Sequence, residues 1–459
     1  MKKIKLLIAC LILAQVGTAK AEDLLSIYQQ ALDADPQLQS AALKVEIGAA
    51  QKGQALGQML PQISANTNWS KNIQASGTAG VPSSTCRNPP CTSNYTGTRY
   101  TVSLTQSVLD FAKFWDWRRA QEIENQYASE NIEAQHTLMF NVVKKYFDVL
   151  EAEDQLYYLQ AEKDSTRKQL EQVQKLYAKQ MVLVTDLYEV EARLDQINAT
   201  EIEAETVLVT ARESLKELTN TEPVALYKLR DEIDYKKLDG ALADWIEVAK
   251  SENPTLAAQL SAIAAAGDNV AVQKSRYLPV VDMQLNYNAT NTGYQSINLG
   301  SNYETQVAAI NVTIPLFTGG TTTNRLFEAQ HKLSMSKYEN EAKIRALIKE
   351  TSDSFLSSNA SVRRISATRK ALDSAIKSRE SMESGFSYGV QTISDVLNAQ
   401  KGEFKVKRDL SQAKYGYIKN KMRFLTATGL ISDENMHEVN SWLQTMPKQP
   451  EIISGQKAS

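Results

Sequence analysis

The residues that could support catalysis are few and far apart. The chain of 459 residues has three histidines, His136, His331 and His437, and each is embedded in helical or tail sequence. A catalytic nucleophile needs a base within hydrogen-bond reach and a third group that orients the base, and no such set can be assembled around these positions. The sequence also lacks a Walker-type phosphate-binding loop. We therefore expect that the protein is not an enzyme and that it has no cofactor and no metal site. Any energy that its function requires must come from another protein.

A pair of cysteines offers the one plausible covalent feature. Cys86 and Cys91 stand in the segment STCRNPPCTSNY, which is rich in Ser, Thr, Asn and Pro and is typical of a loop. Two thiols without a nearby histidine are too few ligands for a metal. In an oxidising compartment such a pair favours a small disulfide that closes the loop.

The N-terminus is typical of a secretory signal peptide, which we assign to residues 1–21. A basic start at 2–5 is followed by an apolar run at 6–14 and by small residues at 19–21. Cys10 formally fits a lipid-attachment pattern, but the apolar run continues past it, which favours cleavage after the small residues. The remaining chain has 47 basic and 53 acidic residues, a net charge of −6, and this balance gives no indication of nucleic-acid binding.

An internal repeat organises the rest of the chain. LLSIYQQALDADPQL at 24–38 aligns with LADWIEVAKSENPTL at 242–256, and VTDL at 184–187 aligns in the same order with ISDV at 393–396. The sequence therefore predicts two copies of one unit. The predicted parts are the first repeat at 22–230 (strand pair about 61–109, turn near 180–186), the second repeat at 231–430 (strand pair about 279–316, turn near 388–394), and a partly disordered tail at 431–459.

Each copy has one very long helical pattern. Apolar residues recur at helical spacing, and proline and glycine are absent from 112–179. A helix of this length would extend for about 100 Å, and the second copy has its counterpart at about 321–384. Because so long a helix cannot bury its apolar stripe inside a compact domain, we expect it to pack along other long helices as in a coiled coil.

Four shorter runs alternate apolar residues with uncharged polar or acidic ones. They lie at 62–69, 100–105, 281–289 and 308–314. A half-buried sheet of a soluble protein gives the same alternation. In an exported chain without an apolar stretch of about 20 residues, the alternative is a membrane barrel with lipid outside and water inside. Four strands cannot close such a barrel, so this interpretation requires several chains.

The repeat, the strand pairs and the junctions together resemble the TolC family of outer-membrane efflux and secretion channels. The resemblance covers about residues 22–430. Its landmarks are YQQALDADPQL near the start, SVLDFAKF from Ser107, VTDLYEVEARLD from Val184, IPLFTGG from Ile314 and SGFSYGVQTISDVLNAQ from Ser384.

The resemblance implies a mixed α and β membrane protein that forms a homotrimer. Twelve strands, four from each chain, would make one β-barrel in the outer membrane of a Gram-negative cell, in contact with its lipid. Twelve helices would continue the barrel as a tunnel across the periplasm. Such a duct would serve tripartite efflux pumps or type I protein secretion. Its coiled-coil end would open like an iris when a periplasmic adaptor and an energised inner-membrane transporter engage it, and the partners would select the cargo.

The resemblance also implies a gate at the coiled-coil end. Position matching places Thr185 and Asp186 opposite Phe386 and Gln391, which would link the two hairpins of helices in the closed state. The resemblance places a tyrosine and an arginine where this chain has Phe386 and Gln391. Phenylalanine has no hydroxyl to donate and glutamine has no charge, so we expect a weaker or differently built closure.

The narrowest part of the tunnel is expected near the second turn. The resemblance implies a ring of aspartates carried here by Asp395, with Asn398 at the second ring position, so that a trimer would have three carboxylates rather than six. We expect weaker block by cations as a result. The alternative for Asp395 is a cap in the first helical turn. Gly389 is a candidate docking position for the adaptor, or simply a glycine that the turn requires.

A second class of function fits the same pattern. An exported structural or adhesive coiled-coil protein would also need long amphipathic helices, but it would have no channel activity. Membrane behaviour separates the two classes.

Overall fold

The structure is a computed structural model of the chain that describes residues 22–76, 91–223, 225–294 and 301–444. The predicted signal peptide and Cys86 lie outside the described residues, and so does the side chain of Cys91. The described residues form two compact units. We call Leu43–Ser129 with Ala257–Glu341 the sheet unit, and the remainder the helical unit. Each unit contains segments of both predicted repeats.

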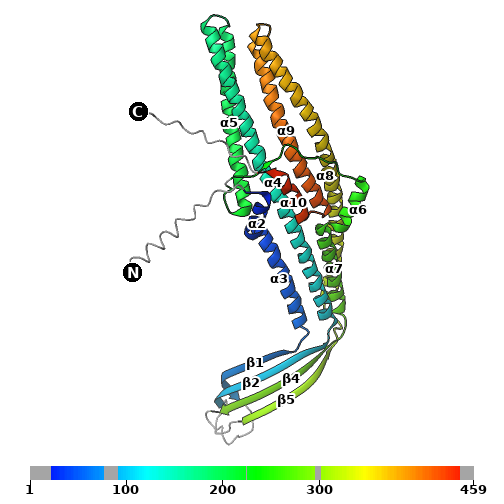
Figure 1. Cartoon of the computed structure of the whole chain (residues 1–459). Coiled ribbons are helices and arrows are strands. Elements are labelled where there is room, and N and C mark those ends of the chain that lie inside the picture. Colours follow the sequence, from blue (N-terminus) through cyan, green and yellow to red (C-terminus); the bar gives the residue numbers. More distant parts are fainter. Residues whose placement is uncertain (1–21, 77–90, 224, 295–300, 445–459) are drawn as a thin grey trace, which may run out of the picture. The chain divides into compact units, whose positions relative to one another are not determined.

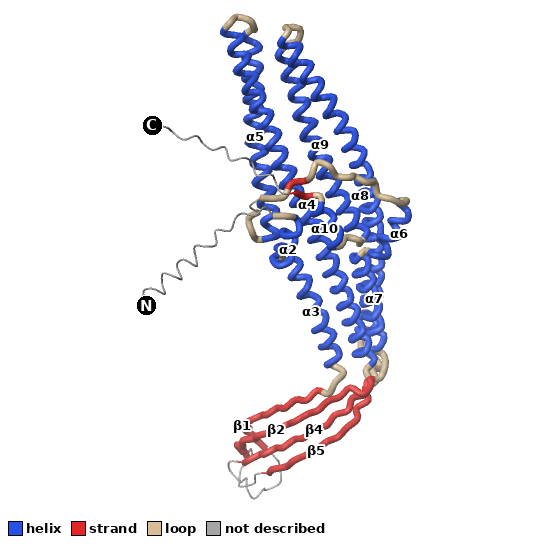
Figure 2. Tube along the Cα trace, in the orientation of Figure 1, coloured by secondary structure: helices blue, strands red, loops and turns tan. Residues whose placement is uncertain are grey.

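The sheet unit contains four antiparallel strands in the order β1-β2-β4-β5 (Figures 1 and 2). Their bounds are β1 (Gln62–Ser76), β2 (Cys91–Leu109), β4 (Val280–Tyr294) and β5 (Ser301–Thr313). The four alternating runs of the sequence lie within or at the ends of these strands. Strands β1 and β5 are the two edges of the sheet.

The register of the strands separates apolar from polar side chains. Ile63 lies opposite Leu104, which lies opposite Leu285, and these three residues therefore share one face of the sheet. The next row on the opposite face has Ser103 paired with Asn286. Because side chains alternate between the faces of a strand, this register gives the sheet one apolar face and one polar face.

Each strand of the four-stranded sheet is connected in the chain to one helix. Helix α3 (Pro36–Gly57) precedes β1, and α4 (Phe111–Ala178) follows β2. Helix α7 (Pro254–Ser275) precedes β4, and α8 (Thr321–Ser387) follows β5. A Cβ atom added to Gly48 of α3 would lie 3.0 Å from the Cα atom of Glu124 in α4, so the missing side chain lets these two helices approach closely.

The helical unit is built from two antiparallel hairpins and several short elements. The first hairpin is α4 with α5 (Val184–Thr219), and the second hairpin is α8 with α9 (Ile393–Thr428). The short elements are α2 (Leu24–Ala34), β3 (Lys228–Leu229), α6 (Leu242–Glu252), α10 (Asp433–Ser441) and β6 (Leu443–Gln444). The long helices begin and end close to the positions predicted from the absence of glycine and proline.

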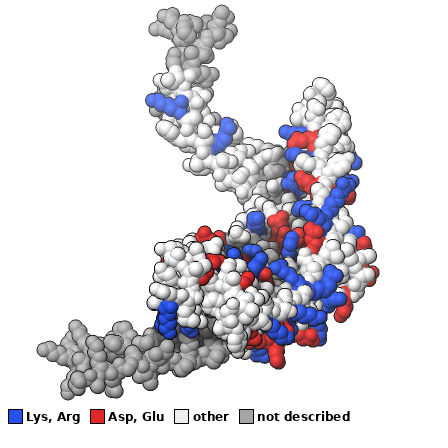
Figure 3. Space-filling view, turned by 90° about the horizontal axis from the view of Figure 1, so that it is seen from above, with Lys and Arg blue, Asp and Glu red and all other residues white. Residues whose placement is uncertain are grey.

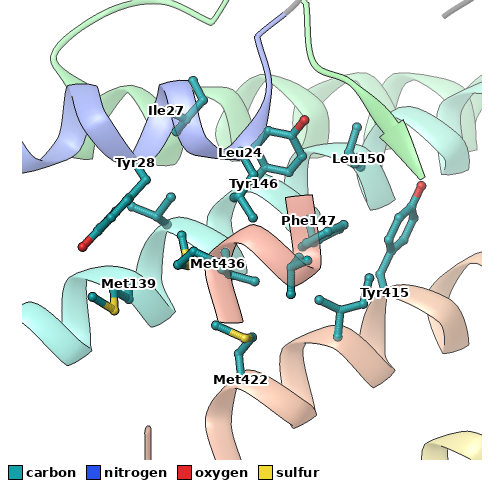
Figure 4. Packing of buried hydrophobic residues seen from close by; sticks show 14 of the residues in the cluster. Leu24, Ile27, Tyr28, Met139, Tyr146, Phe147, Leu150, Tyr415, Met422 and Met436 are labelled. Carbon is teal, nitrogen blue, oxygen red and sulfur yellow. The ribbon is translucent and has the colours of Figure 1, made fainter. Parts of the chain in front are cut away.

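A large apolar core forms where the short elements meet the hairpins. Figure 4 shows Ile27 of α2, Phe147 of α4, Met422 of α9 and Met436 of α10 packed together. Tyr146 is also buried there, and its hydroxyl donates a hydrogen bond to the carbonyl oxygen of Tyr227 at 3.0 Å. Burial raises the pKa of Tyr146 far above its usual value. We call this set of buried residues the central core.

The helix breaks at Asp35-Pro36 and at Asn253-Pro254 have the same local cause. The side chain of Asp35 accepts a hydrogen bond from the backbone N–H of Gln37 at 2.7 Å. The side chain of Asn253 accepts one from the N–H of Thr255 at 2.9 Å. A short polar residue followed by proline is a favourable start for a helix, because the side chain caps the free N–H groups and proline needs none.

Two further properties bear on function. None of the helices in the described ranges is long and apolar enough to cross a membrane. On the face seen in Figure 3, basic and acidic side chains of the described residues are interspersed along the helices. This arrangement is consistent with the charge balance of the sequence.

Candidate functional site: the turns of the two hairpins

The two hairpin turns have the same backbone geometry. Gln180 in the first turn has φ 60°, and Gly389 in the second turn has φ 72°. In both turns the backbone N–H of the next residue donates a hydrogen bond to the carbonyl oxygen five residues earlier. Met181 donates to Leu176 at 3.0 Å, and Val390 donates to Gly385 at 2.9 Å. These are the hydrogen bonds of a Schellman motif, which requires the left-handed conformation that glycine adopts freely. The turn therefore explains Gly389 without a partner protein.

An aspartate caps the helix that follows each turn. The Asp186 carboxylate accepts a hydrogen bond from the backbone N–H of Leu183 at 3.1 Å. The Asp395 carboxylate accepts from the N–H of Thr392 at 3.0 Å and from its hydroxyl at 2.7 Å. The Thr392 hydroxyl accepts in turn from the N–H of Asp395, which completes a capping box. The alternative interpretation of Asp395 as a cap is thus confirmed by the geometry.

The cap also fixes the charge of Asp395. Its hydrogen bonds with Thr392 lower the pKa of the carboxyl below its usual value. The group is therefore an ionised carboxylate at neutral pH. Asn398 is exposed one turn further along α9, and residues three apart lie on the same side of a helix.

The residues predicted as gate links do not bond to one another within the described part of this single chain. Thr185 and Gln391 are exposed, and Asp186 serves as the cap. The side chain of Gln391 instead lies against its own hairpin, where a Cβ atom added to Gly385 would be 2.5 Å from its Cγ atom. Their role as links between hairpins stays a prediction.

Phe386 packs in an apolar cluster that joins all four long helices. The buried members are Val173, Val190, Ile393, Val396 and Leu397, and the partly buried ones are Leu170, Val182, Leu187, Met382 and Phe386. We call this set the tip cluster. Phenylalanine lacks the hydroxyl of tyrosine, and in this cluster Phe386 makes apolar contacts instead.

A layer of buried polar contacts lies next to the tip cluster, and the sequence did not reveal it. Gln400 of α9 donates a hydrogen bond to the hydroxyl of Thr166 of α4 at 3.2 Å. Glu162 of α4 is 1% exposed and forms ion pairs with Arg193 of α5 and with Arg408 of α9. This carboxylate therefore links the two hairpins within the chain.

A second buried carboxylate stabilises the second hairpin. Glu403 of α9 is 4% exposed and pairs with Arg379 of α8 and with Lys407, at 2.6 Å for Lys407. Burial alone would raise the pKa of Glu403, but the hydrogen bonds and charges of Lys407 and Arg379 outweigh burial and lower it. In the sequence, such acidic residues between lysines and arginines resemble an ordinary solvated helix face, so nothing local could have identified them.

The arrangement of an amphipathic antiparallel sheet and long helical hairpins is the fold of outer-membrane channel proteins. The chain is similar to the CmeC outer membrane channel of Campylobacter jejuni, with a TM-score of 0.79 at 16% identity over 92% of this chain and 90% of that one. It is similar to VceC of Vibrio cholerae with a TM-score of 0.73 at 16% identity, over 88% of this chain and 96% of that one.

The sequence comparison identifies the family. The chain belongs to the outer membrane efflux protein family, whose model matches residues 27–221 and 245–430. It is 30% identical to the outer membrane protein TolC of Vibrio cholerae over 457 residues, which is 97% of this chain and 100% of that protein. It is 26% identical to the alkaline protease secretion protein AprF of Pseudomonas aeruginosa, over 92% of this chain and 87% of that protein. The protein is therefore an outer-membrane protein of Gram-negative bacteria, as predicted.

Proposed function

We propose that the protein is the outer-membrane exit duct of tripartite efflux pumps or of type I protein secretion. Three copies share one β-barrel in the outer membrane, and their helices extend it into the periplasm. The hairpin turns close the duct at rest and open by an iris-like movement when a periplasmic adaptor and an energised inner-membrane transporter engage. The duct itself carries out no chemical reaction and needs no cofactor.

The apolar face of the sheet is the observation that carries this proposal. Ile63 is 71% exposed, Val102 is 45% exposed and Ile310 is 74% exposed in the single chain. A soluble protein would cover such a face with helices or with a second sheet. Lipid would cover the same face in a membrane barrel, while the polar face, where Thr101 bonds to Asn288, would line the water-filled interior.

The edges of the sheet support an assembly of several chains. Unpaired N–H and C=O groups at an exposed edge are not tolerated in lipid, so β1 and β5 need partners. The sheet has four antiparallel strands, so β1 and β5 run in opposite directions and β5 of one copy can pair with β1 of the next. Two copies would give a barrel of eight strands. Side chains fill the interior of a barrel of that size, which leaves no room for a water-filled channel. Three copies give twelve strands and room for water, which agrees with the trimer that the family resemblance implies.

The turns are the proposed site of closure and docking. Asp395 and Asn398 would line the constriction, and Thr185 with Asp186 would approach Phe386 and Gln391 of the other hairpin. Beside Gly389, the side chains of Tyr388 and Val390 are 83% and 75% exposed. Two exposed apolar side chains at a tight turn form a surface that an adaptor could cover.

The names of the relatives support export as the activity. One is named for secretion of alkaline protease, and another, from Dickeya chrysanthemi, is the proteases secretion protein PrtF. The competing function is an exported structural or adhesive coiled-coil protein. The amphipathic sheet argues against it, because a scaffold has no need of an apolar outer face.

Reconstitution in a planar lipid bilayer tests the proposal. The purified protein is expected to give discrete single-channel conductance steps with a small conductance at rest. A scaffold protein would give no steps at any protein concentration, and that result would overturn the proposal.

A further inference from the structure

We infer that Glu162 is a positioning residue for closure: its buried ion pairs with Arg193 and Arg408 join the two hairpins in the closed duct and release into water when it opens. The inference rests on the proposed function as a gated duct. According to this inference, the polar contacts that keep the duct closed lie along the helices, away from the turns. There, Glu162 would take over the role for which Phe386 and Gln391 lack the necessary groups.

The contacts of Glu162 are divided between the hairpins. One carboxylate oxygen accepts a hydrogen bond from Nη2 of Arg193 in α5, and the other accepts from Nη1 of Arg408 in α9 at 2.9 Å. The side chain of Glu162 is 2% exposed, and those of Arg193 and Arg408 are 15% and 24% exposed. All three charged groups are thus withdrawn from water only while α4, α5 and α9 stay together.

The position of this link separates two apolar regions. On α4, the central core includes Leu150 and the tip cluster begins at Leu170. Glu162 lies between them, about 16 Å from Val173 at 1.5 Å per residue. Movement of the tip that leaves the central core intact must bend or separate the helices in this intermediate stretch, where Glu162 forms its ion pairs.

Ion pairs suit a contact that must separate repeatedly. Exposing apolar side chains to water costs free energy in proportion to their exposed area. Apolar groups gain no favourable hydration that offsets this cost. Buried ions regain their hydration when they separate, so a buried ion pair adds little net stability compared with an apolar contact. A buried carboxylate that loses its partner is nevertheless strongly unfavourable, so the packed state forms only in the correct register.

Other ion pairs on α4 provide a matched control. Lys163 of α4, the residue after Glu162, pairs with Glu201 of α5 at 2.6 Å. The Glu201 side chain is 13% exposed, so this pair is also largely withdrawn from water. This ion pair joins α4 to α5 within the first hairpin.

The experiment compares Glu162→Gln with Glu201→Gln in the full-length protein. Single-channel conductance at rest is measured in planar bilayers, and export with the adaptor and transporter present is measured in cells. Glu162→Gln leaves Arg193 and Arg408 without a counter-charge, so the resting conductance should rise about tenfold or more. Glu201→Gln should leave it within about twofold of the unmodified protein, because the Lys163–Glu201 pair joins α4 to α5 within one hairpin.

A second variant tests the opposite direction. Replacing all three residues, as Glu162→Leu, Arg193→Met and Arg408→Leu, substitutes an apolar contact for the ion pairs. Such replacements are often neutral or stabilising for the packed state. The triple variant should have a resting conductance no higher than the unmodified protein, but reduced export, because an apolar contact separates less readily in water.

The outcomes are distinguishable from a failure of the proposed function. If the unmodified protein gives no conductance, the duct proposal is wrong. If it conducts and Glu162→Gln matches Glu201→Gln, the inference about Glu162 is wrong. Should Glu162→Gln fail to assemble, a short reducible bis-methanethiosulfonate cross-link between Thr166→Cys and Gln400→Cys tests the same separation. The inference predicts that this cross-link stops export until a reductant is added, and unchanged export would overturn it.

Discussion

The Asp395 carboxylate accepts hydrogen bonds from both the backbone N–H and the hydroxyl of Thr392. This relationship orients the carboxylate and keeps it ionised. A fixed carboxylate at the beginning of α9 can cap the helix and line a constriction at the same time. The two interpretations of Asp395 are therefore compatible, and they can be tested separately.

Asp395→Asn should weaken block of the duct by multivalent cations. The change removes the charge that attracts the cation, and it weakens the capping box at the start of α9. The measurement is the concentration of a trivalent cation that halves single-channel conductance. The control is Thr392→Val, which removes the other half of the same capping box but leaves the charge of Asp395 in place. An equal loss of block in both variants would mean that the cap, and not the ring, explains the effect.

Cation block should persist at acidic pH. The pKa of Asp395 is lowered by its hydrogen bonds with Thr392, so the charge is complete above the ordinary aspartate pKa of about 3.9. It is lost only as the pH falls through the lowered folded-state value. Block measured between pH 7 and about pH 4 should therefore be nearly constant. A midpoint of block well above pH 4 would show that repulsion between the three carboxylates of the ring outweighs the hydrogen bonds with Thr392.

Phe386→Ala should raise the resting conductance. Phe386 packs against the tip cluster, and removal of a half-buried aromatic ring is expected to destabilise this contact by about 2 kcal/mol. The control is Tyr388→Ala, because Tyr388 is 83% exposed and lies outside the cluster. Resting conductance that responds equally to both changes would exclude the tip cluster as part of the closure.

Two neighbouring residues of β5 distinguish the lipid face from the water face. Ile310→Lys should impair assembly in the membrane, because a lysine on the lipid face of a membrane barrel is destabilising. Asn311→Lys should be tolerated, since Asn311 bonds to Gln284 on the polar face. The amount of protein in purified outer membranes measures both. If Asn311→Lys is the more damaging change, the assignment of the faces is reversed.

Gly429→Ala should destabilise the helical unit more than Gly389→Ala does. Gly429 has a positive φ, and an added Cβ atom would lie 2.5 Å from the carbonyl oxygen of Glu252, so a loss of about 2 kcal/mol or more is expected. Gly389 also has a positive φ but open space around it, so only backbone strain of about 1 kcal/mol applies. Thermal unfolding of the two variants should show this order. Equal melting temperatures would contradict it.

The sequence predicted those elements whose signal is local. The absence of glycine and proline over 112–179 predicted a helix that the structure has at Phe111–Ala178. The alternation of apolar and polar residues predicted the strands, because a strand with one apolar face requires an apolar residue at every second position. Helix α10 is the counterexample, because a short and mostly polar segment assigned to the tail contributes Met436 and Val439 to the central core.

The candidate site was only partly predictable for a related reason. The turns and caps depend on residues a few positions apart, so Asp395 and Gly389 could be identified from the sequence. The link at Glu162 depends on Arg408, which is 246 residues away. A buried glutamate and an exposed one have the same helical neighbours, and only the packing of α4 against α9 distinguishes them.

The central claim is that a sheet of four strands becomes a membrane duct only when several chains share it. Native mass spectrometry of the protein, extracted from outer membranes in a mild detergent, tests this claim most directly. We predict an assembly of three chains that stays intact after detergent is removed in the gas phase. A single chain as the dominant species would contradict the claim, because one copy leaves both edge strands unpaired.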